Sequence, residues 1–343
     1  MRFIYIFLII FIFSNNLLSN NLFDTEEYQI KFVSEDINLL KEKKINDIKI
    51  KSFKSIITKI LTEQNLKKLD ISNIEFVNKF VLNFTINEEK IVNDTYFSKV
   101  KVNFNKNLIF DYLINNNLQF VDSIPKKFLI IIFEQKEFEN YFLSNENTFY
   151  NYLNNSNNEL FKKYFLIPDL DFNDRYIFNE YHLKNNIIKQ HNLLNHKYQT
   201  EYQILINSYK KNNLFIYDLY LFFKNKKYYI GKIPYNNLNY EELFKHVLSK
   251  SINKWKELNL IDPTITNSIE CNISINNIYE LSHVRSLLKS NRIIKYINLK
   301  SIKLNYNLYT ILFFGNLDVF KNSLKNNRLY LENLNNDCNI KLL

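Results

Sequence analysis

The chain of 343 residues contains only two glycines and no alanine. Phosphate-binding loops, dinucleotide fingerprints of the G-x-G-x-x-G type and G-x-S-x-G nucleophile elbows need clustered glycines, because their backbone takes positive φ or lies close to a ligand. Gly231 and Gly315 are far apart in the chain. The sequence therefore excludes the common glycine-dependent cofactor and nucleophile motifs.

Arginine is also scarce, with five residues against forty lysines. Asparagine, isoleucine, phenylalanine and tyrosine are abundant, which indicates a coding bias towards adenine and thymine. The formal net charge is +10, but arginine is the usual reader of guanine edges and the lysines are scattered. We expect no nucleic-acid partner, and at most a weak contact with an anionic membrane surface.

Residues 1–21 have the layout of a secretory signal peptide. Met1-Arg2 precedes an unbroken apolar run, Phe3 to Phe13, and a polar stretch ends at Asn21. The run is short for a membrane span, and the small-x-small cleavage site is missing. A signal peptide is favoured, with an uncleaved N-terminal anchor or a buried core segment as the alternatives. We expect the protein to be periplasmic or otherwise exported.

Cys271 and Cys338 are the two cysteines of the chain. An exported protein can join such a pair in a disulfide bond. Without a C-x-x-C spacing, neither redox catalysis nor a zinc knuckle is indicated. A structural disulfide and two buried free thiols both remain open.

The last part of the chain, residues 266–343, predicts a ferredoxin-like unit of β-α-β-β-α-β order. The expected elements are strands at Ile269–Ile275, Ile293–Leu304, Tyr309–Phe314 and Leu329–Leu331, with helices over Asn277–Lys289 and around Leu317 to Leu324. Gly315 stands at the turn between a strand and the second helix, where we expect it to serve backbone geometry.

Residues 22–140 predict a similar order. The expected strands are Tyr28–Val33, Phe80–Ile91, Tyr96–Phe104 and Phe128–Phe133, and the expected helices are Ile45–Leu61 and Leu108–Leu113. Both ends of the chain pass from a strand ending in Phe into a short amphipathic helix, which suggests a duplication.

Residues 141–265 form the predicted middle unit. Helices are expected at Leu160–Phe165, Leu183–Leu194 and Tyr240–Leu258, and strands at Tyr202–Ser208, Phe215–Phe223 and Lys227–Ile233. The fold class is therefore α/β of the α+β type, with small mixed sheets in three units of about a hundred residues each.

Three stretches resemble a known family. They are Tyr96–Phe104, Leu166–Asp174, and Tyr279–Leu288 followed by Phe314-Gly315. With them the chain resembles the secreted bacterial proteins built on domain of unknown function number 2066, over nearly the whole mature chain. The resemblance implies an exported α/β protein of no known activity. The chain also resembles the small periplasmic α/β domains of envelope-assembly lipoproteins, although no lipobox cysteine is present.

The segment from Asp169 to Glu180 places oxygen ligands as a calcium-binding EF-hand loop does. Asp174, however, stands where that loop needs glycine, and Pro168 stands where the entering helix should still run. We interpret the segment as a surface turn whose aspartates cap the next helix.

Other candidate chemistry is weak. The five histidines, His182, His191, His196, His246 and His283, show no zinc-ligand spacing. Adjacent glutamate pairs diverge on any helix or strand, and no local motif selects a nucleophile. The aromatic residues Phe313 and Phe314 suggest core packing rather than an RNA-recognition sheet. We therefore name no catalytic, cofactor-binding or metal-ligating residue.

The sequence favours a non-catalytic binding or assembly protein of the cell envelope, with an envelope protein or another envelope component as partner. The alternative is a secreted hydrolase whose catalytic groups come from separated positions. A cleft holding convergent carboxylates or a Ser/His pair would favour the hydrolase, and an exposed strand edge or apolar patch would favour the binding protein. Oligomeric state stays open.

Overall fold

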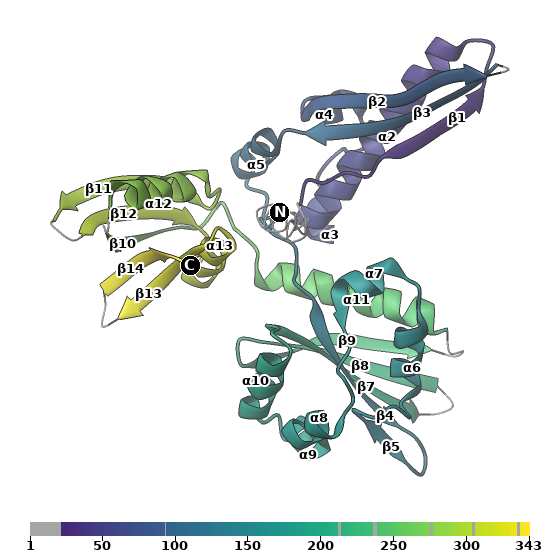
Figure 1. Ribbon diagram of the computed structural model, residues 1–343, viewed down its shortest axis with the longest axis vertical. Coiled ribbons are helices and arrows are strands. Elements are labelled where there is room, and N and C mark those ends of the chain that lie inside the picture. The colour runs from purple at the N-terminus through teal and green to yellow at the C-terminus, as the bar shows by residue number, and fades with distance from the viewer. Residues whose placement is uncertain are drawn as a thin grey trace, which may run out of the picture. The chain divides into compact units, whose positions relative to one another are not determined.

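The computed structural model describes residues 22–92, 94–211, 214–235, 239–274, 277–303, 306–334 and 337–343. The predicted signal segment, residues 1–21, lies outside them. The chain divides into two compact units (Figure 1). One joins the residues up to Ile124 with Ile261–Leu343, and the other is Pro125–Leu260. The fold is α+β, built on three small sheets in the described residues, as predicted. Whether the three predicted segments fold as separate domains stays a prediction.

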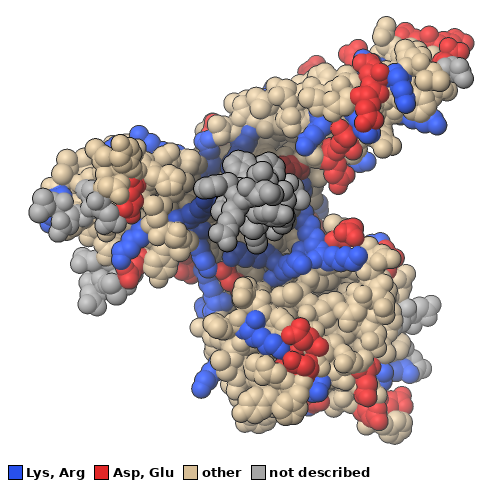
Figure 2. All heavy atoms as spheres, in the orientation of Figure 1, with Lys and Arg blue, Asp and Glu red and all other residues tan. Residues whose placement is uncertain are grey.

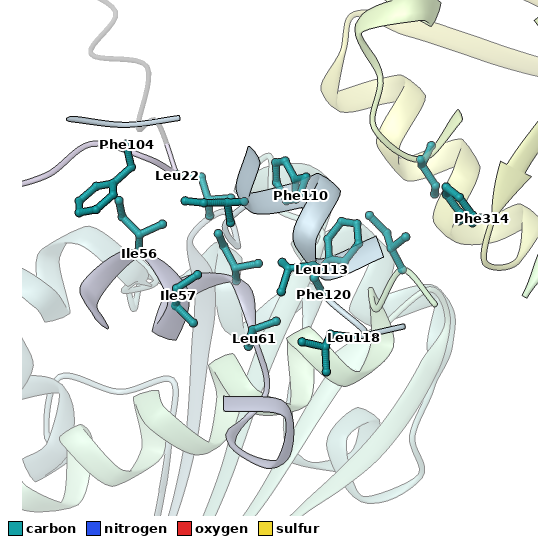
Figure 3. Packing of buried hydrophobic residues seen from close by; sticks show 14 of the residues in the cluster. Leu22, Ile56, Ile57, Leu61, Phe104, Phe110, Leu113, Leu118, Phe120 and Phe314 are labelled. Atoms are coloured by element: carbon teal, nitrogen blue, oxygen red, sulfur yellow. The ribbon is translucent and has the colours of Figure 1, made fainter. Parts of the chain in front are cut away.

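The N-terminal part of unit 1 is a three-stranded antiparallel sheet of order β1-β3-β2 with helices on one face. Its elements are β1 (Tyr28–Val33), α2 (Ile37–Ile60), α3 (Glu63–Leu66), α4 (Ile74–Asn78), β2 (Val81–Val92), β3 (Thr95–Phe104) and α5 (Lys106–Asn115). Alternate residues of β3, from Tyr96 to Phe104, are buried, because they face α2 while their neighbours face away from it. Figure 3 shows Ile56 and Ile57 of α2 packed with Phe104, Phe110 and Leu113.

The C-terminal part of unit 1 is a five-stranded sheet of order β11-β12-β10-β14-β13. Its elements are β10 (Thr266–Ser274), α12 (Ile278–Ser290), β11 (Ile294–Ile302), β12 (Tyr306–Phe314), α13 (Leu317–Asn326), β13 (Leu329–Leu334) and β14 (Asp337–Leu342). The first six elements follow the predicted β-α-β-β-α-β order. The sequence did not predict β14, which pairs parallel with β10 and separates it from β13.

Unit 2 is a sheet of order β5-β4-β7-β8-β9, with β6 paired to β4. Its strands are β4 (Phe128–Gln135), β5 (Asn140–Phe142), β6 (Phe165–Leu166), β7 (Tyr202–Lys211), β8 (Leu214–Phe223) and β9 (Lys226–Tyr235). Its helices are α6 (Thr148–Asn155), α7 (Glu159–Tyr164), α8 (Phe172–Ile177), α9 (Glu180–Lys184), α10 (Ile188–Lys197) and α11 (Tyr240–Leu258).

Both faces of this sheet carry helices (Figure 1). Phe149 of α6 packs on Tyr217 of β8 and on Phe244 of α11. On the opposite face, His191 of α10 stacks on Phe222 of the same strand. Since Tyr217 and Phe222 are an odd number of positions apart in one strand, they point to opposite faces.

The prediction that the strand Phe128–Phe133 belongs to the N-terminal unit is wrong. This segment is β4, which pairs parallel with β7 in unit 2. All seven residues from Phe128 to Glu134 are buried, and burial without alternation requires cover on both faces of a sheet. In the part of the chain that the structure describes, the N-terminal sheet has helices on one face only, whereas the sheet of unit 2 has helices on both faces.

The shortage of glycine shows in the backbone. Ten described residues other than glycine take positive φ. Asn117, Asn186 and Gln199 do so directly after the C-caps of α5, α9 and α10, where glycine is the usual residue. Each is followed by a hydrogen bond that closes the helix end, as from Thr200 N to Asn195 O at 3.0 Å. Gly315 has φ +79° between β12 and α13, which confirms its predicted role in backbone geometry.

Candidate functional site

The EF-hand-like segment is organised around a buried aspartate. Asp174 is fully buried, and its carboxylate accepts hydrogen bonds from Lys197 Nζ at 2.7 Å, from Tyr198 OH at 2.7 and 2.8 Å, and from Leu170 N at 2.9 Å. Burial is the largest single influence on Lys197 and opposes its charge, but the hydrogen bonds to Asp174 and Tyr198 and the charge of Asp174 together outweigh it, so the pKa of this ammonium is raised above its usual value. Because these donors occupy both carboxylate oxygens of Asp174, the oxygens are not free to ligate a metal ion.

The predicted capping role is confirmed for Asp171, whereas Asp174 is a buried residue of α8 and does not lie in a surface turn. Asp171 is the N-cap of α8 and accepts a hydrogen bond from Asp174 N at 2.7 Å. Arg175 of the same helix donates to the carbonyls of Leu143 and Leu170, both of which have positive φ. The guanidinium therefore ties two strained turns to this helix. Within the described ranges, no group of three or more His, Cys, Asp and Glu is placed to hold a metal ion.

The histidines are dispersed. His182 completes a capping box at the start of α9, His246 lies 3.9 Å from Glu242 on α11, and His283 is exposed. His191 is fully buried, with Nδ1 2.6 Å from Gln203 Oε1. Burial lowers the pKa of His191 to about 4, so this ring is neutral and belongs to the core at neutral pH.

Cys271 and Cys338 form a disulfide bond with a Cα–Cα distance of 4.5 Å. They are direct neighbours in the register of the parallel strands β10 and β14, and both are buried. Phe313 and Phe314 of β12 are also buried, and Phe313 stacks on Phe320 of α13. The aromatic residues of this strand serve core packing, as predicted.

The sequence missed a cavity of about 640 Å³ in unit 2. It lies at the carboxyl ends of the parallel strands β4 and β7, a common place for ligands in α/β sheets. Its lining residues come from both strands, the β4–β5 turn, α6, β8 and the start of α11: Glu134, Gln135, Lys136, Glu137, Phe138, Glu139, Thr148, Phe149, Ser208, Lys210, Phe215 and Tyr240.

A hydrogen-bond chain runs along one wall of this cavity. Tyr240 OH donates to Thr148 Oγ1 at 3.0 Å, and Thr148 donates from Oγ1 and from its backbone N to the two oxygens of Glu134 at 2.9 and 3.1 Å. The carboxylate thus stabilises the N-terminus of α6. Burial raises the pKa of Tyr240, so its hydroxyl stays a donor. One feature of the sequence could have indicated this site: Glu134 follows directly on the apolar run of β4.

A second candidate surface is the free edge of β2, which pairs with β3 alone in the described residues. This strand of 12 residues has no buried position. Leu82, Phe84, Ile91 and Val92 are large apolar residues that it exposes. A long edge with exposed apolar side chains is a template for pairing with another strand.

No family model matches the chain, and no curated protein matches it significantly. Among the described residues, no helix is long and apolar enough to cross a membrane.

Proposed function

We propose that the protein is an exported, non-catalytic binding protein of the cell envelope that takes up an extended segment of another polypeptide as an added strand. The free edge of β2 is the observation that carries this proposal. The layout of residues 1–21, the resemblance to the secreted family of domain of unknown function number 2066, and the buried disulfide bond, which is typical of oxidising compartments, support export.

The edge offers two different faces to an added strand. Phe84, Ile86 and Ile91 are paired with β3 residues that face α2, so an added strand would place apolar side chains against them on this side. Backbone hydrogen bonds along the edge would supply affinity, and alternate side chains would supply specificity.

The opposite face carries more lysines than carboxylates, and Glu27 lies on it beside Asn87 and Lys99. Lys31 and Lys90 lie over the ring of Phe97, with Nζ 5.2 and 5.7 Å from its centroid, and Lys101 points to the same face from β3. Glu88 neutralises Lys99 by an ion pair of 2.6 Å. In Figure 2 acidic and basic side chains lie close together towards the end of the β2–β3 hairpin at which its turn lies. Charge complementarity therefore favours a partner segment that alternates apolar and acidic residues.

Calorimetric titration of the full chain with a peptide of alternating valine and glutamate tests the binding mode. We expect binding that Ile91→Lys weakens at least tenfold, roughly 1.4 kcal/mol, because the new charge meets the apolar side of the peptide. Val33→Lys is the matched control, since Val33 is an exposed apolar residue on the opposite edge strand, β1. Equal binding of a valine–lysine peptide, or an equal loss in the control, would overturn strand addition at β2.

Fractionation tests export separately. With a tag after Leu343, we expect the protein outside the cytoplasm, with the thiols of Cys271 and Cys338 blocked to alkylation until a reductant is added. Recovery with the cytoplasm and free thiols would contradict export without bearing on the edge.

A further inference from the structure

We propose that the cavity of unit 2 binds a small organic cation with an apolar body, such as a primary amine carried on an aromatic or hydrocarbon group. This site is distinct from the β2 edge, which belongs to unit 1. The cavity volume, about 640 Å³, lies within the range of small-molecule sites.

The polar end of the cavity is built on neighbouring positions of two parallel strands. Glu134 of β4 and Ser208 of β7 are register partners, and both are buried, with exposed fractions of 7% and 3%. Ser208 lines the cavity, so its hydroxyl can exchange a hydrogen bond with a ligand group there.

Glu134 has remaining capacity for a donor. Thr148 supplies two hydrogen bonds, and Lys136 Nζ lies at 3.5 Å from Glu134 Oε1. A carboxylate offers about four lone-pair positions, so an ammonium group can add to this set. The carboxylate is held in place by α6, which makes it a preorganised acceptor.

The charge and the walls of the cavity select the ligand class. Glu134, Glu137 and Glu139 outnumber Lys136 and Lys210 among its lining residues, so an anion would meet an excess of like charge. The aromatic lining residues are Phe138, Phe149, Phe215 and Tyr240. Aromatic faces attract cations and apolar groups alike, whereas a neutral hydrocarbon would leave Glu134 and Ser208 without a new partner.

Phe138 marks the mouth of the cavity. It lies in the β4–β5 turn and is 95% exposed, which is unusual for a large apolar side chain. A ligand that fills the cavity would cover part of this ring, so Phe138 is a position where truncation weakens binding without disturbing the core.

Titration of the full chain with phenethylamine, 2-phenylethanol and phenylpropionate tests the proposal, because the three probes share an aromatic body and differ in charge. We expect phenethylamine to bind at least tenfold more tightly than either other probe. Phe138→Ala should weaken phenethylamine several-fold, and Phe172→Ala, at an exposed phenylalanine of α8, should leave it unchanged. Glu134→Gln should remove the preference for the amine.

Phenylpropionate binding as tightly as phenethylamine, or no binding of the amine, would overturn the proposal. If Glu134→Gln does not fold, the order of the three probes on the unaltered protein and the Phe138→Ala comparison still decide it. If the valine–glutamate peptide does not bind at the β2 edge, the result for the amine still stands. The two proposals are therefore tested independently.

Discussion

Strands β4 and β2 lie in sheets of different design. In β4 the residues from Phe128 to Glu134 are buried without alternation, because helices cover both faces of the unit 2 sheet. In β2 no residue is buried, since this strand forms an edge of a sheet covered on one face. The difference separates a strand whose side chains stabilise the fold from one whose outer edge is unpaired among the described residues.

The C-terminal sheet differs from unit 2 by a covalent cross-link. The disulfide bond joins β10 to β14 across a sequence separation of 67 residues, while unit 2 contains no cysteine. Trp255, the single tryptophan of the chain, lies in α11 of unit 2. Its fluorescence therefore reports unit 2 separately from the disulfide-bonded sheet.

The largest effect is expected from removing the disulfide. The double substitution Cys271→Ala with Cys338→Ala should lower the free energy of unfolding of unit 1 by about 4 kcal/mol, because a long loop regains its freedom in the unfolded chain. Urea unfolding followed by circular dichroism should show an earlier transition, while the Trp255 midpoint stays in place. An equal shift of the Trp255 midpoint would show that the two units unfold together.

The next largest effect is expected from shortening a side chain in β4, in contrast to the same change in β2. Ile131→Ala in β4 should cost about 3 kcal/mol, because it leaves a cavity at a position that is 1% exposed. Ile91→Ala in β2, at an exposed position, should stay within about 0.5 kcal/mol. Urea midpoints of both variants check this contrast. A large loss in Ile91→Ala would mean that the β2 edge is already covered in the protein as it folds.

Most elements could be predicted from the sequence, because period-2 and period-3.6 patterns survive even in this biased composition. The sheet to which β4 belongs could not, since an unbroken apolar run shows that a strand is buried but not which neighbours bury it. The extra strand β14 was missed because its pairing with β10 is long-range, and its sequence, Asp337–Leu342, alternates only briefly.

The candidate sites divide in the same way. The capping role of Asp171 follows from local sequence, since an N-cap lies next to the helix that it serves. The cavity could not be predicted, because Glu134, Ser208 and Tyr240 are brought together by pairing between distant strands and by the start of α11. The contacts of Lys31 and Lys90 with Phe97, on the face of the N-terminal sheet opposite α2, could not be predicted from residue spacing either.

A smaller effect is expected from His191, which lies on a covered sheet face. Its pKa is lowered to about 4, so the unfolded chain takes up a proton first as the pH falls below the usual value of about 6.5. Stability is therefore lost between pH 6.5 and pH 4, with a drop of about 2 kcal/mol by pH 5. His191→Phe should flatten this slope in urea unfolding, and His283→Gln, at an exposed position of α12, should not. An unchanged slope in His191→Phe would contradict the assignment.

The smallest effect concerns the helix ends that lack glycine. Arg328 is exposed, follows the C-cap of α13 and has φ +60°, a conformation that costs residues with a Cβ about 1 kcal/mol. Arg328→Gly should therefore raise the free energy of unfolding of unit 1 by up to about 1 kcal/mol, whereas Lys321→Gly, inside the same helix, should lower it by about as much. Thermal unfolding of the pair checks the sign. If both variants lose stability, the entropy that glycine adds to the unfolded chain outweighs the relief of strain, and the scarcity of glycine has no cost at this helix end.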